Sequence, residues 1–296
     1  MKSKKIKYTK GGNKLRANRI ICLAQKSGFF SNFNNITSCL MSKKEHDLVE
    51  VDFSGNLKGF RYSGRRRDLN IWNLFFEPIK TKKQKNIKYT KKIYGQDIPR
   101  TIMDKNIYER RSAFQLNFGQ YFYEKIWMEQ EIWRSKANYF VNKYIKLKPY
   151  LKEKINTFYE NNFNPNNTIA VHIRHPGIYV EQPRFTLPTC QEYIYHIKNN
   201  YDYKNATIFL ATDYKQPINL LKKEFKNLVI QDASRTRQDR RQIHMIKGGK
   251  PSLAEEAITD VYLMSKCNYM VHVISNLPLA AVCINKNVQS DLICII

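Results

Sequence analysis

The side chains best suited to chemistry in this sequence follow an apolar run that begins at residue 168. The run ends in His172-Ile-Arg174, and alternation along a strand places His172 and Arg174 on one face. A terminal arginine presents a planar fork of donors that suits a diphosphate. Glu181 follows a Pro176-Gly177 turn, and its carboxylate could act as a base. The pattern favours transfer with a phosphate leaving group; the alternative is a histidine packed beneath a loop and an arginine paired at a sheet end.

Two later apolar runs also end in polar residues. Asp213 ends the run 208–213, where its carboxylate could receive ribose hydroxyls or a base N–H, although aspartate in such a position also caps helices. Ser275 and Asn276 open a predicted helix, whose backbone N–H groups and dipole attract phosphate. Their simpler role is N-capping. Asp260 lies inside an earlier amphipathic helix.

The elements that would position these residues alternate between strands and helices. Strands are predicted at residues 168–174, 206–212, 228–231 and 269–274, with helices at residues 189–199, 217–225, 252–266 and 277–284. Strands that are apolar on both faces predict a parallel sheet covered on both sides. Ligands of such sheets bind beyond the carboxyl ends of the strands, where Arg174, Asp213 and Ser275 fall.

The first half of the chain opens with another strand–turn–helix pattern. Residues 19–24 predict a short buried strand, and a polar turn begins at Gly28. A helix is predicted over residues 36–41, and the next strand over residues 48–53. Together these segments predict the opening of a βαβ unit.

The middle of the chain is basic and then helical. Residues 61–111 are rich in lysine and arginine, and we interpret them as a solvated insertion or as a holder of an anionic acceptor. Residues 112–160 are predicted to be mainly helical, with Pro149 in the first turn of one helix. An Asn-rich stretch predicts the boundary between an N-terminal lobe, residues 1–164, and a C-terminal lobe, residues 165–296. The aromatic and aliphatic face of this part is assigned to the core: Phe122, Ile126, Trp127, Trp133, Phe140 and Tyr144.

Taken in order, the motifs resemble those of the GT-B fucosyltransferase superfamily, which includes nodulation-type and core α1,6-fucosyltransferases and protein O-fucosyltransferases. The family pattern of His-x-Arg, Ala-Thr-Asp and Asp-x-x-x-Leu-Ser stands here as His172-Ile-Arg174, Ala211-Thr-Asp213 and the segment from Asp260 to Val271. The resemblance covers residues 168–284 best and reaches the Gly28 turn weakly. It implies an α/β protein with two Rossmann-like lobes and a cleft between them. The chain departs from the pattern at His175-Pro-Gly177, which lacks an acid, and at Asn268 and Asn276.

The resemblance further implies an inverting glycosyltransferase that moves fucose from GDP-fucose to the hydroxyl of a glycan or glycolipid acceptor. Arg174 and Glu181 would be catalytic, and no cofactor or metal is expected, since the sequence contains no Asp-x-Asp pair. The basic loop at residues 232–250 is predicted to be a mobile lid over the donor. The residues expected to bind the donor are His172, Arg174, Asp213, Asp260, Ser275, Asn276 and Gly28.

The net charge of +26 favours an anionic partner, although solvated lysines in a composition rich in Lys, Asn, Ile and Tyr also explain it. Two alternatives follow: a GT-B transferase with another nucleotide sugar, or a basic, non-enzymatic binder of nucleic acid or acidic glycan. No helix-turn-helix, RNP or zinc signature is present, so nucleic acid is the less favoured partner. No apolar run is long enough to cross a bilayer or direct secretion. We expect a cytoplasmic protein that is free or peripheral to the inner, anionic face of a membrane.

Overall fold

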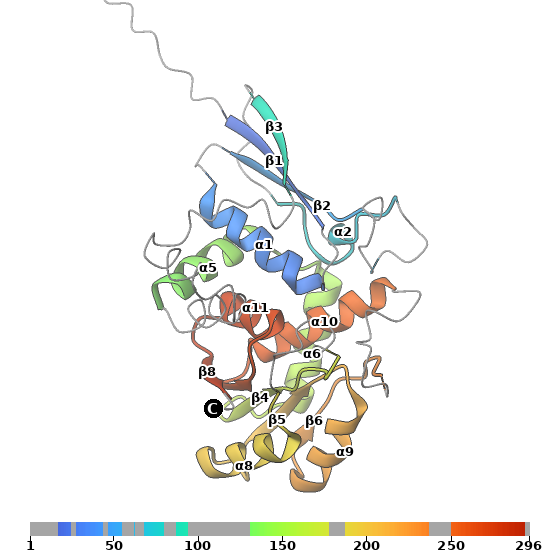
Figure 1. The fold of residues 1–296 in the computed structure, drawn as a ribbon, viewed down its shortest axis with the longest axis vertical. Helices are drawn as coiled ribbons and strands as arrows, with labels where there is room; N and C mark the ends of the chain where they lie inside the picture. Colours follow the sequence, from blue (N-terminus) through green and yellow to red (C-terminus); the bar gives the residue numbers. More distant parts are fainter. Residues whose placement is uncertain are drawn as a thin grey trace, which may run out of the picture.

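The structure is a computed structural model of the chain. It describes residues 17–24, 28–43, 47–54, 62, 68–79, 87–93, 131–177, 187–236 and 250–293. These residues form two parallel sheets with helices between them and beyond one of them (Figure 1). The fold is therefore the mixed α/β arrangement that the sequence predicts.

The N-terminal sheet has the order β2-β1-β3, with β1 at Ala17–Leu23, β2 at Leu48–Asp52 and β3 at Ile87–Ile93. Helix α1 (Phe29–Ser42) connects β1 to β2, so the predicted βαβ opening is confirmed. The helix begins seven residues before the predicted start, directly after Gly28. Phe29, Phe33 and Ile36 are buried at helical spacing, and the intervening serine and asparagines gave this stretch the composition of a turn.

Strand β3 lies within the basic stretch that we interpreted as an insertion. It pairs with β1 in parallel as an edge strand, and the side chain of Lys92 is exposed. Edge strands tolerate lysines because charge discourages pairing with other chains. The insertion interpretation is thus wrong for residues 87–93. Before it, the short helix α2 (Trp72–Phe75) contributes Trp72, whose ring stacks on Phe76 at 4.3 Å.

The C-terminal sheet is wholly parallel, in the order β6-β5-β4-β7-β8. Its strands are β4 (Thr168–His172), β5 (Thr207–Ala211), β6 (Leu228–Val229), β7 (Tyr269–His272) and β8 (Gln289–Leu292). Its helices are α8 (Cys190–Asn200), α9 (Lys215–Glu224), α10 (Pro251–Met264) and α11 (Asn276–Ile284). All four predicted strands and all four predicted helices are present, with shorter strands, and β8 is an addition.

Alternate residues of β4 face two different layers of helices. Ile169 and Val171 share a core with Tyr193 and Ile197 of α8. Ala170 instead joins the core that holds α10 and α11. In Figure 1, α8 and α9 lie below this sheet, while α10 and α11 lie above it, toward α1. Both faces of the sheet are therefore covered, as a parallel sheet requires.

Helices α5 (Glu131–Tyr144) and α6 (Pro149–Asn162) lie between the two sheets, and Pro149 starts α6 as predicted. Asn138 Nδ2 on α5 donates to Ile284 O at 2.7 Å, which fixes α5 against α11. The side chains assigned to the core are only half-buried at Trp133, Phe140 and Tyr144, and residues 112–130 lie outside the described residues. The division at residue 164 stays a prediction.

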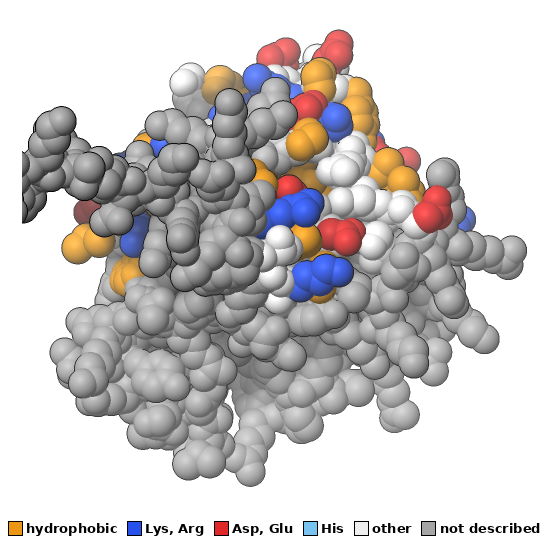
Figure 2. Space-filling view, turned by 90° about the horizontal axis from the view of Figure 1, so that it is seen from above, with side chains coloured by type: hydrophobic (Ala, Val, Ile, Leu, Met, Phe, Trp, Pro, Cys, Tyr) orange, Lys and Arg blue, Asp and Glu red, His pale blue; other side chains and the backbone are white. Residues whose placement is uncertain are grey.

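Surface charge on one described face is mixed. Figure 2 shows lysine or arginine next to aspartate or glutamate, with hydrophobic side chains between them. On this face, the lysines and arginines of the described residues therefore do not form a single basic patch. None of the described helices is long and apolar enough to cross a membrane.

Candidate donor-binding site

The carboxyl ends of β4 and β7 bring two predicted residues into contact. Strand β4 pairs His172 with His272 of β7, and each strand continues by a short loop. Arg174 follows β4, and its Nη1 donates to Ser275 Oγ at 2.7 Å. The predicted proximity of these two side chains at the sheet edge is thus present in the structure.

Ser275 is the N-cap of α11 by backbone position, but its side chain makes no capping hydrogen bond. Its hydroxyl instead accepts from Arg174, and the residue is buried. The simple N-capping interpretation therefore does not account for this side chain. The arrangement places a guanidinium beside the N-terminus of a helix, and both carry positive electrostatic potential.

The last residues of β4 and β7 are two buried histidines, His172 and His272. Burial, together with Arg174 and His272, holds the pKa of His172 well below its ordinary value. Burial also lowers the pKa of His272 to about 4. His272 Nε2 lies 2.8 Å from Ser290 Oγ, whereas His172 Nδ1 has no partner among the described residues. Both imidazoles are therefore neutral at pH 7, and His172 has a ring nitrogen left to bind a ligand.

His175 is a third buried histidine, which the sequence analysis noted only as a departure. Its Nδ1 accepts from Gly177 N at 2.8 Å, and its ring contacts Tyr214 with centroids 5.0 Å apart. The histidine thus shapes the turn that follows Arg174. Glu181, the predicted base, lies outside the described residues, as do residues 178–186 around it.

Of the two predicted carboxylates, Asp213 lies close enough to Asp260 to act on it electrostatically. Asp260 is buried within α10 and accepts a hydrogen bond from Gln231 Nε2. Burial raises the pKa of Asp260 to about 7, and the negative charges of Glu256 and Asp213 add to this, while Gln231 and Arg235 oppose it. Its carboxylate is therefore close to its ionisation point at neutral pH, as expected for a functional group in a site.

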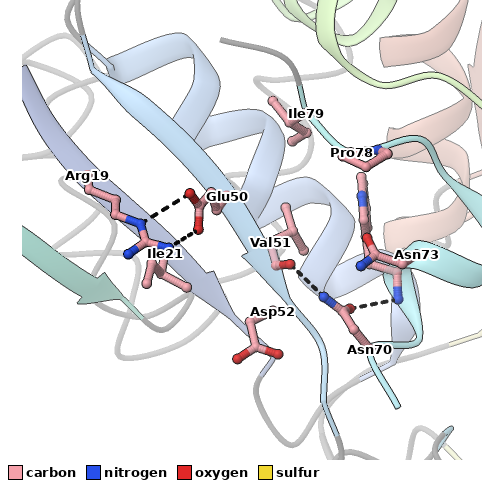
Figure 3. A pocket seen from close by; sticks show the side chains of 10 residues that line it. Arg19, Ile21, Glu50, Val51, Asp52, Asn70, Asn73, Pro78 and Ile79 are labelled. Carbon is pink, nitrogen blue, oxygen red and sulfur yellow. Dashed lines mark hydrogen bonds and ion pairs between the residues drawn. The ribbon is translucent and has the colours of Figure 1, made fainter. Parts of the chain in front are cut away.

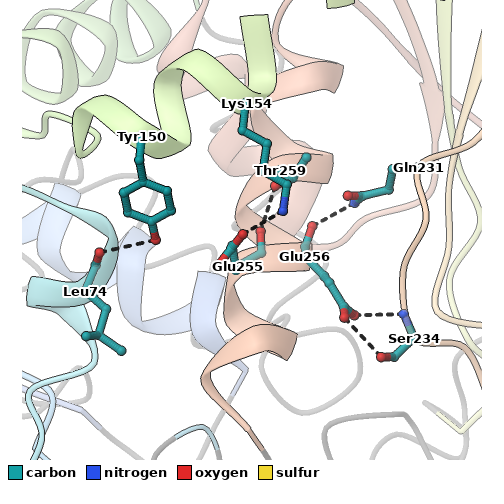
Figure 4. A network of polar contacts seen from close by, with 8 residues as sticks. All are labelled: Leu74, Tyr150, Lys154, Gln231, Ser234, Glu255, Glu256 and Thr259. Carbon is teal, nitrogen blue, oxygen red and sulfur yellow. Dashed lines mark hydrogen bonds and ion pairs between the residues drawn. The ribbon is translucent and has the colours of Figure 1, made fainter. Parts of the chain in front are cut away.

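A network from α10 holds the first residues of the predicted lid, which begins at residue 232 (Figure 4). Glu256 accepts from Ser234 N at 2.9 Å and from Ser234 Oγ at 3.0 Å, and its backbone oxygen accepts from Gln231 Nε2 at 2.8 Å. Arg235 Nη2 donates to Gln231 O at 2.7 Å. Residues 231–236 are thereby fixed beside Asp260. Residues 237–249, the rest of the predicted lid, lie outside the described residues.

The N-terminal half meets the start of α11 through Asn34 on α1. Its Nδ2 donates to the backbone oxygen and to Oδ1 of Asn276, each at 3.1 Å. Asn276 thus joins the two halves of the protein at the edge that carries Arg174 and Ser275. Gly28, which precedes α1, has its backbone oxygen bonded by Asn32 Nδ2 at 3.2 Å. No described contact links Gly28 to Arg174 or Asp260.

A pocket of about 380 Å³ lies against β1 and β2 of the N-terminal sheet (Figure 3). Arg19 on β1 forms a two-pronged ion pair with Glu50 on β2, with distances of 3.1 and 2.7 Å. Asn70 donates to Val51 O at 2.8 Å and so fixes the segment that closes the pocket beside β2. The sequence does not predict this pocket, because its residues come from four separate stretches. It is lined by Arg19, Ile21, Glu50, Val51, Asp52, Asn70, Trp72, Asn73, Pro78 and Ile79.

The described residues contain no group of three or more His, Cys, Asp or Glu side chains placed to hold a metal ion. The family model described as Nodulation protein Z (NodZ) matches residues 127–283, which is just over half of the chain. The chain belongs to the NodZ family. The expected family, and with it the expected glycosyltransferase, are confirmed.

Solved structures of NodZ and of POFUT1 share the fold of the chain. NodZ fucosyltransferase from Bradyrhizobium is 16% identical with a TM-score of 0.50, and the match covers 89% of this chain and 92% of that one. NodZ α-1,6-fucosyltransferase co-crystallised with GDP is 16% identical, with a TM-score of 0.51 and coverage of 89% and 91%. POFUT1 in complex with GDP is 12% identical, with a TM-score of 0.53 and coverage of 93% and 98%. No curated protein sequence matches the chain. The GT-B fold is thereby confirmed.

Proposed function

We propose that this NodZ-family protein transfers fucose from GDP-fucose to a glycan hydroxyl, with inversion at the anomeric carbon and without a divalent metal. The observation that carries the proposal is the contact between Arg174 and Ser275 at the start of α11, where a diphosphate would lie beyond the carboxyl ends of β4 and β7. NodZ relatives crystallised with GDP and soaked with GDP-fucose support the choice of donor.

Arg174 stabilises the leaving diphosphate in this mechanism. Ser275 holds one arm of the guanidinium, while Arg174 Nε is buried without a partner among the described residues and can bind a ligand oxygen. The N-terminus of α11 adds backbone N–H groups. Stabilisation of charge that develops on the leaving group is commonly the largest catalytic contribution.

Polar side chains at the carboxyl ends of the same sheet and on α10 recognise the nucleoside. The carboxylate of Asp260 accepts the two N–H groups on one edge of guanine, and neutral His172 offers a ring nitrogen without adding charge. Asp213, at the end of β5, receives the ribose hydroxyls. Such donors stabilise the charged form of a buried carboxylate whose pKa is near 7, and they thereby favour binding.

Glu181 removes the proton of the acceptor hydroxyl in this proposal. Its assignment rests on its place in the sequence after Arg174, with Asp213 and Asp260 as reserves. The acceptor is a glycan or glycolipid held by the N-terminal lobe, where the pocket beside β2 offers planar amide, carboxylate and guanidinium groups for sugar hydroxyls. A fully active Glu181→Gln variant would transfer the role of base to one of the two aspartates.

GDP should stabilise the protein in the presence of EDTA. Arg174 and the start of α11 supply the positive charge that a metal would otherwise bring. At a hundred times its dissociation constant, GDP should add about 2.7 kcal/mol to the free energy of unfolding. Thermal unfolding with GDP, UDP, ADP and CMP measures this directly. Stabilisation by UDP alone would overturn the proposed donor, and a strict need for Mg²⁺ or Mn²⁺ would overturn the proposed mechanism.

The alternative of a basic, non-enzymatic nucleic-acid binder is less well supported. The described face in Figure 2 mixes the two signs of charge, whereas duplex binding depends on a coherent basic surface. Steeply salt-dependent DNA binding, together with no response to any nucleotide, would favour that alternative.

A further inference from the structure

The outer face of α5 carries two large apolar side chains in an exposed position. Ile132 is 82% exposed and Tyr139 is 55% exposed. They lie seven residues apart, and a helix turns by about 100° per residue, so they point to nearly the same side. Lys136 and Lys143 project within an arc of roughly 60° around them by the same geometry. We call these four residues the α5 outer face.

The opposite side of α5 fixes the orientation of this face. Ala137 and Val141 are buried against the core, and Asn138 donates to Ile284 O at 2.7 Å. Arg134 Nη2 donates to Val288 O at 3.3 Å. A rotation that hid Ile132 or Tyr139 would break these contacts. The exposed position is therefore imposed by the packing of the helix, which lies at the side of the molecule beside α1 (Figure 1).

Cations surround the apolar side chains on and beside this face. Lys143 Nζ donates to Tyr139 Oη at 2.8 Å, and Lys136 Nζ lies 5.5 Å from the centre of the Trp133 ring. Lys286, exposed on the turn after α11, reaches Ser135 Oγ at 3.3 Å. Within the sequence of α5 the single acid is Glu131, in the first turn. The surface is thus both apolar and positively charged.

We propose that the α5 outer face docks the protein on an anionic lipid bilayer. Contact with the phosphates of a nucleic acid would not remove the apolar surface of an exposed isoleucine from water. Insertion among acyl chains would, and this is energetically favourable. Tyrosine suits the boundary between headgroups and acyl chains, and lysine extends an apolar stem while keeping its ammonium among the headgroups. Anionic lipid attracts each lysine separately. The inference does not depend on the proposed donor.

Sedimentation with vesicles tests this surface. The full chain should bind vesicles of phosphatidylcholine mixed with phosphatidylglycerol, and bind phosphatidylcholine alone much more weakly. Each lysine near an anionic surface strengthens binding on the order of fivefold. A Lys136→Glu/Lys143→Glu variant should therefore lose well over tenfold in binding, and Ile132→Ser/Tyr139→Ser should lose about tenfold or more.

Tyr195→Ser is the matched control, because Tyr195 is 73% exposed on α8, below the other sheet. This variant and Arg174→Ala should bind vesicles as the unmodified chain does. Near-equal binding to the two kinds of vesicle would overturn the proposal. So would an equal loss in Tyr195→Ser, or unchanged binding in both α5 double variants. Far-UV circular dichroism checks that the variants remain folded.

Discussion

Replacing Arg174 with alanine should lower the turnover number of glycosyl transfer by about a hundredfold or more and leave the fold intact. Removing one preorganised group that stabilises developing charge typically costs about 3–4 kcal/mol of the activation barrier. Arg174 is half-buried and its described side-chain hydrogen bond goes to Ser275. Loss of that bond affects stability much less than catalysis. Steady-state kinetics with the melting temperature separates the two effects.

Three variants sharpen this result. Arg174→Lys should rescue poorly, because an ammonium lacks the planar fork. Ser275→Ala should lower the turnover number less than Arg174→Ala does, because it removes one hydrogen bond of the guanidinium but keeps its charge in the site. Arg19→Ala is the control. Arg19 is also a paired arginine, with Glu50 as its partner, but it lies in the pocket of the N-terminal sheet. This variant should keep the diphosphate contact and the affinity for GDP. Near-normal turnover of Arg174→Ala would exclude the role in leaving-group stabilisation.

Replacing Asp260 with asparagine should weaken GDP binding by about tenfold to a hundredfold, because hydrogen bonds to a charged group contribute about 1.5–3 kcal/mol. The amide is nearly isosteric, and its oxygen can still accept from Gln231. Its NH₂ group, however, opposes the donors of guanine. It would instead favour the carbonyl of xanthine, so the ratio of XDP to GDP affinity should rise. Calorimetric titration with both nucleotides measures the change.

The pH dependence of GDP binding provides an independent test of the role of Asp260. The pKa of Asp260 is raised to about 7, and base N–H donors favour its charged form. GDP affinity of the unmodified chain should therefore be highest above pH 7 and fall as the pH drops below 7. The Asp260→Asn variant should lose this dependence. Glu256→Gln, one turn earlier on α10, is a second probe: it removes a negative charge that raises the pKa of Asp260, so the fall in GDP affinity should move to lower pH. Persistent pH dependence in Asp260→Asn would assign the effect to another group.

The apolar pattern of the sequence was sufficient for most of the C-terminal sheet. Strands such as Thr207–Ala211 are buried on both faces, so the whole run is apolar and stands out from polar helices on either side. Strand β8 was missed because Gln289-Ser-Asp-Leu292 is half-exposed at the edge of the sheet. Strand β3 was missed because it is an edge strand on which Thr90 and Lys92 are exposed, and its lysines suggested a loop.

Site residues at strand ends were accessible from the sequence, but their partners were not. Arg174 and Ser275 fall at equivalent ends of neighbouring strands, so their proximity follows from the sheet alone. Gln231 follows the short strand β6 and donates to Asp260 of α10, while Arg235 donates to Gln231 O and acts on Asp260 only electrostatically. No spacing in the sequence encodes this contact between α10 and the segment after β6. The pocket beside β2 likewise depends on how residues 70–79 return along the sheet.

The most direct test of the central claim is the nucleotide released from a panel of sugar donors in the presence of EDTA. The panel contains GDP-fucose, GDP-mannose, UDP-galactose and UDP-N-acetylglucosamine, each with and without an oligosaccharide acceptor. The proposal predicts that GDP-fucose is the one donor in the panel that yields nucleotide at an appreciable rate and that acceptor increases this rate. Arg174→Ala should lower it by about a hundredfold or more. Release from a UDP-sugar instead, or release from GDP-fucose that Arg174→Ala leaves unchanged, would contradict the proposal.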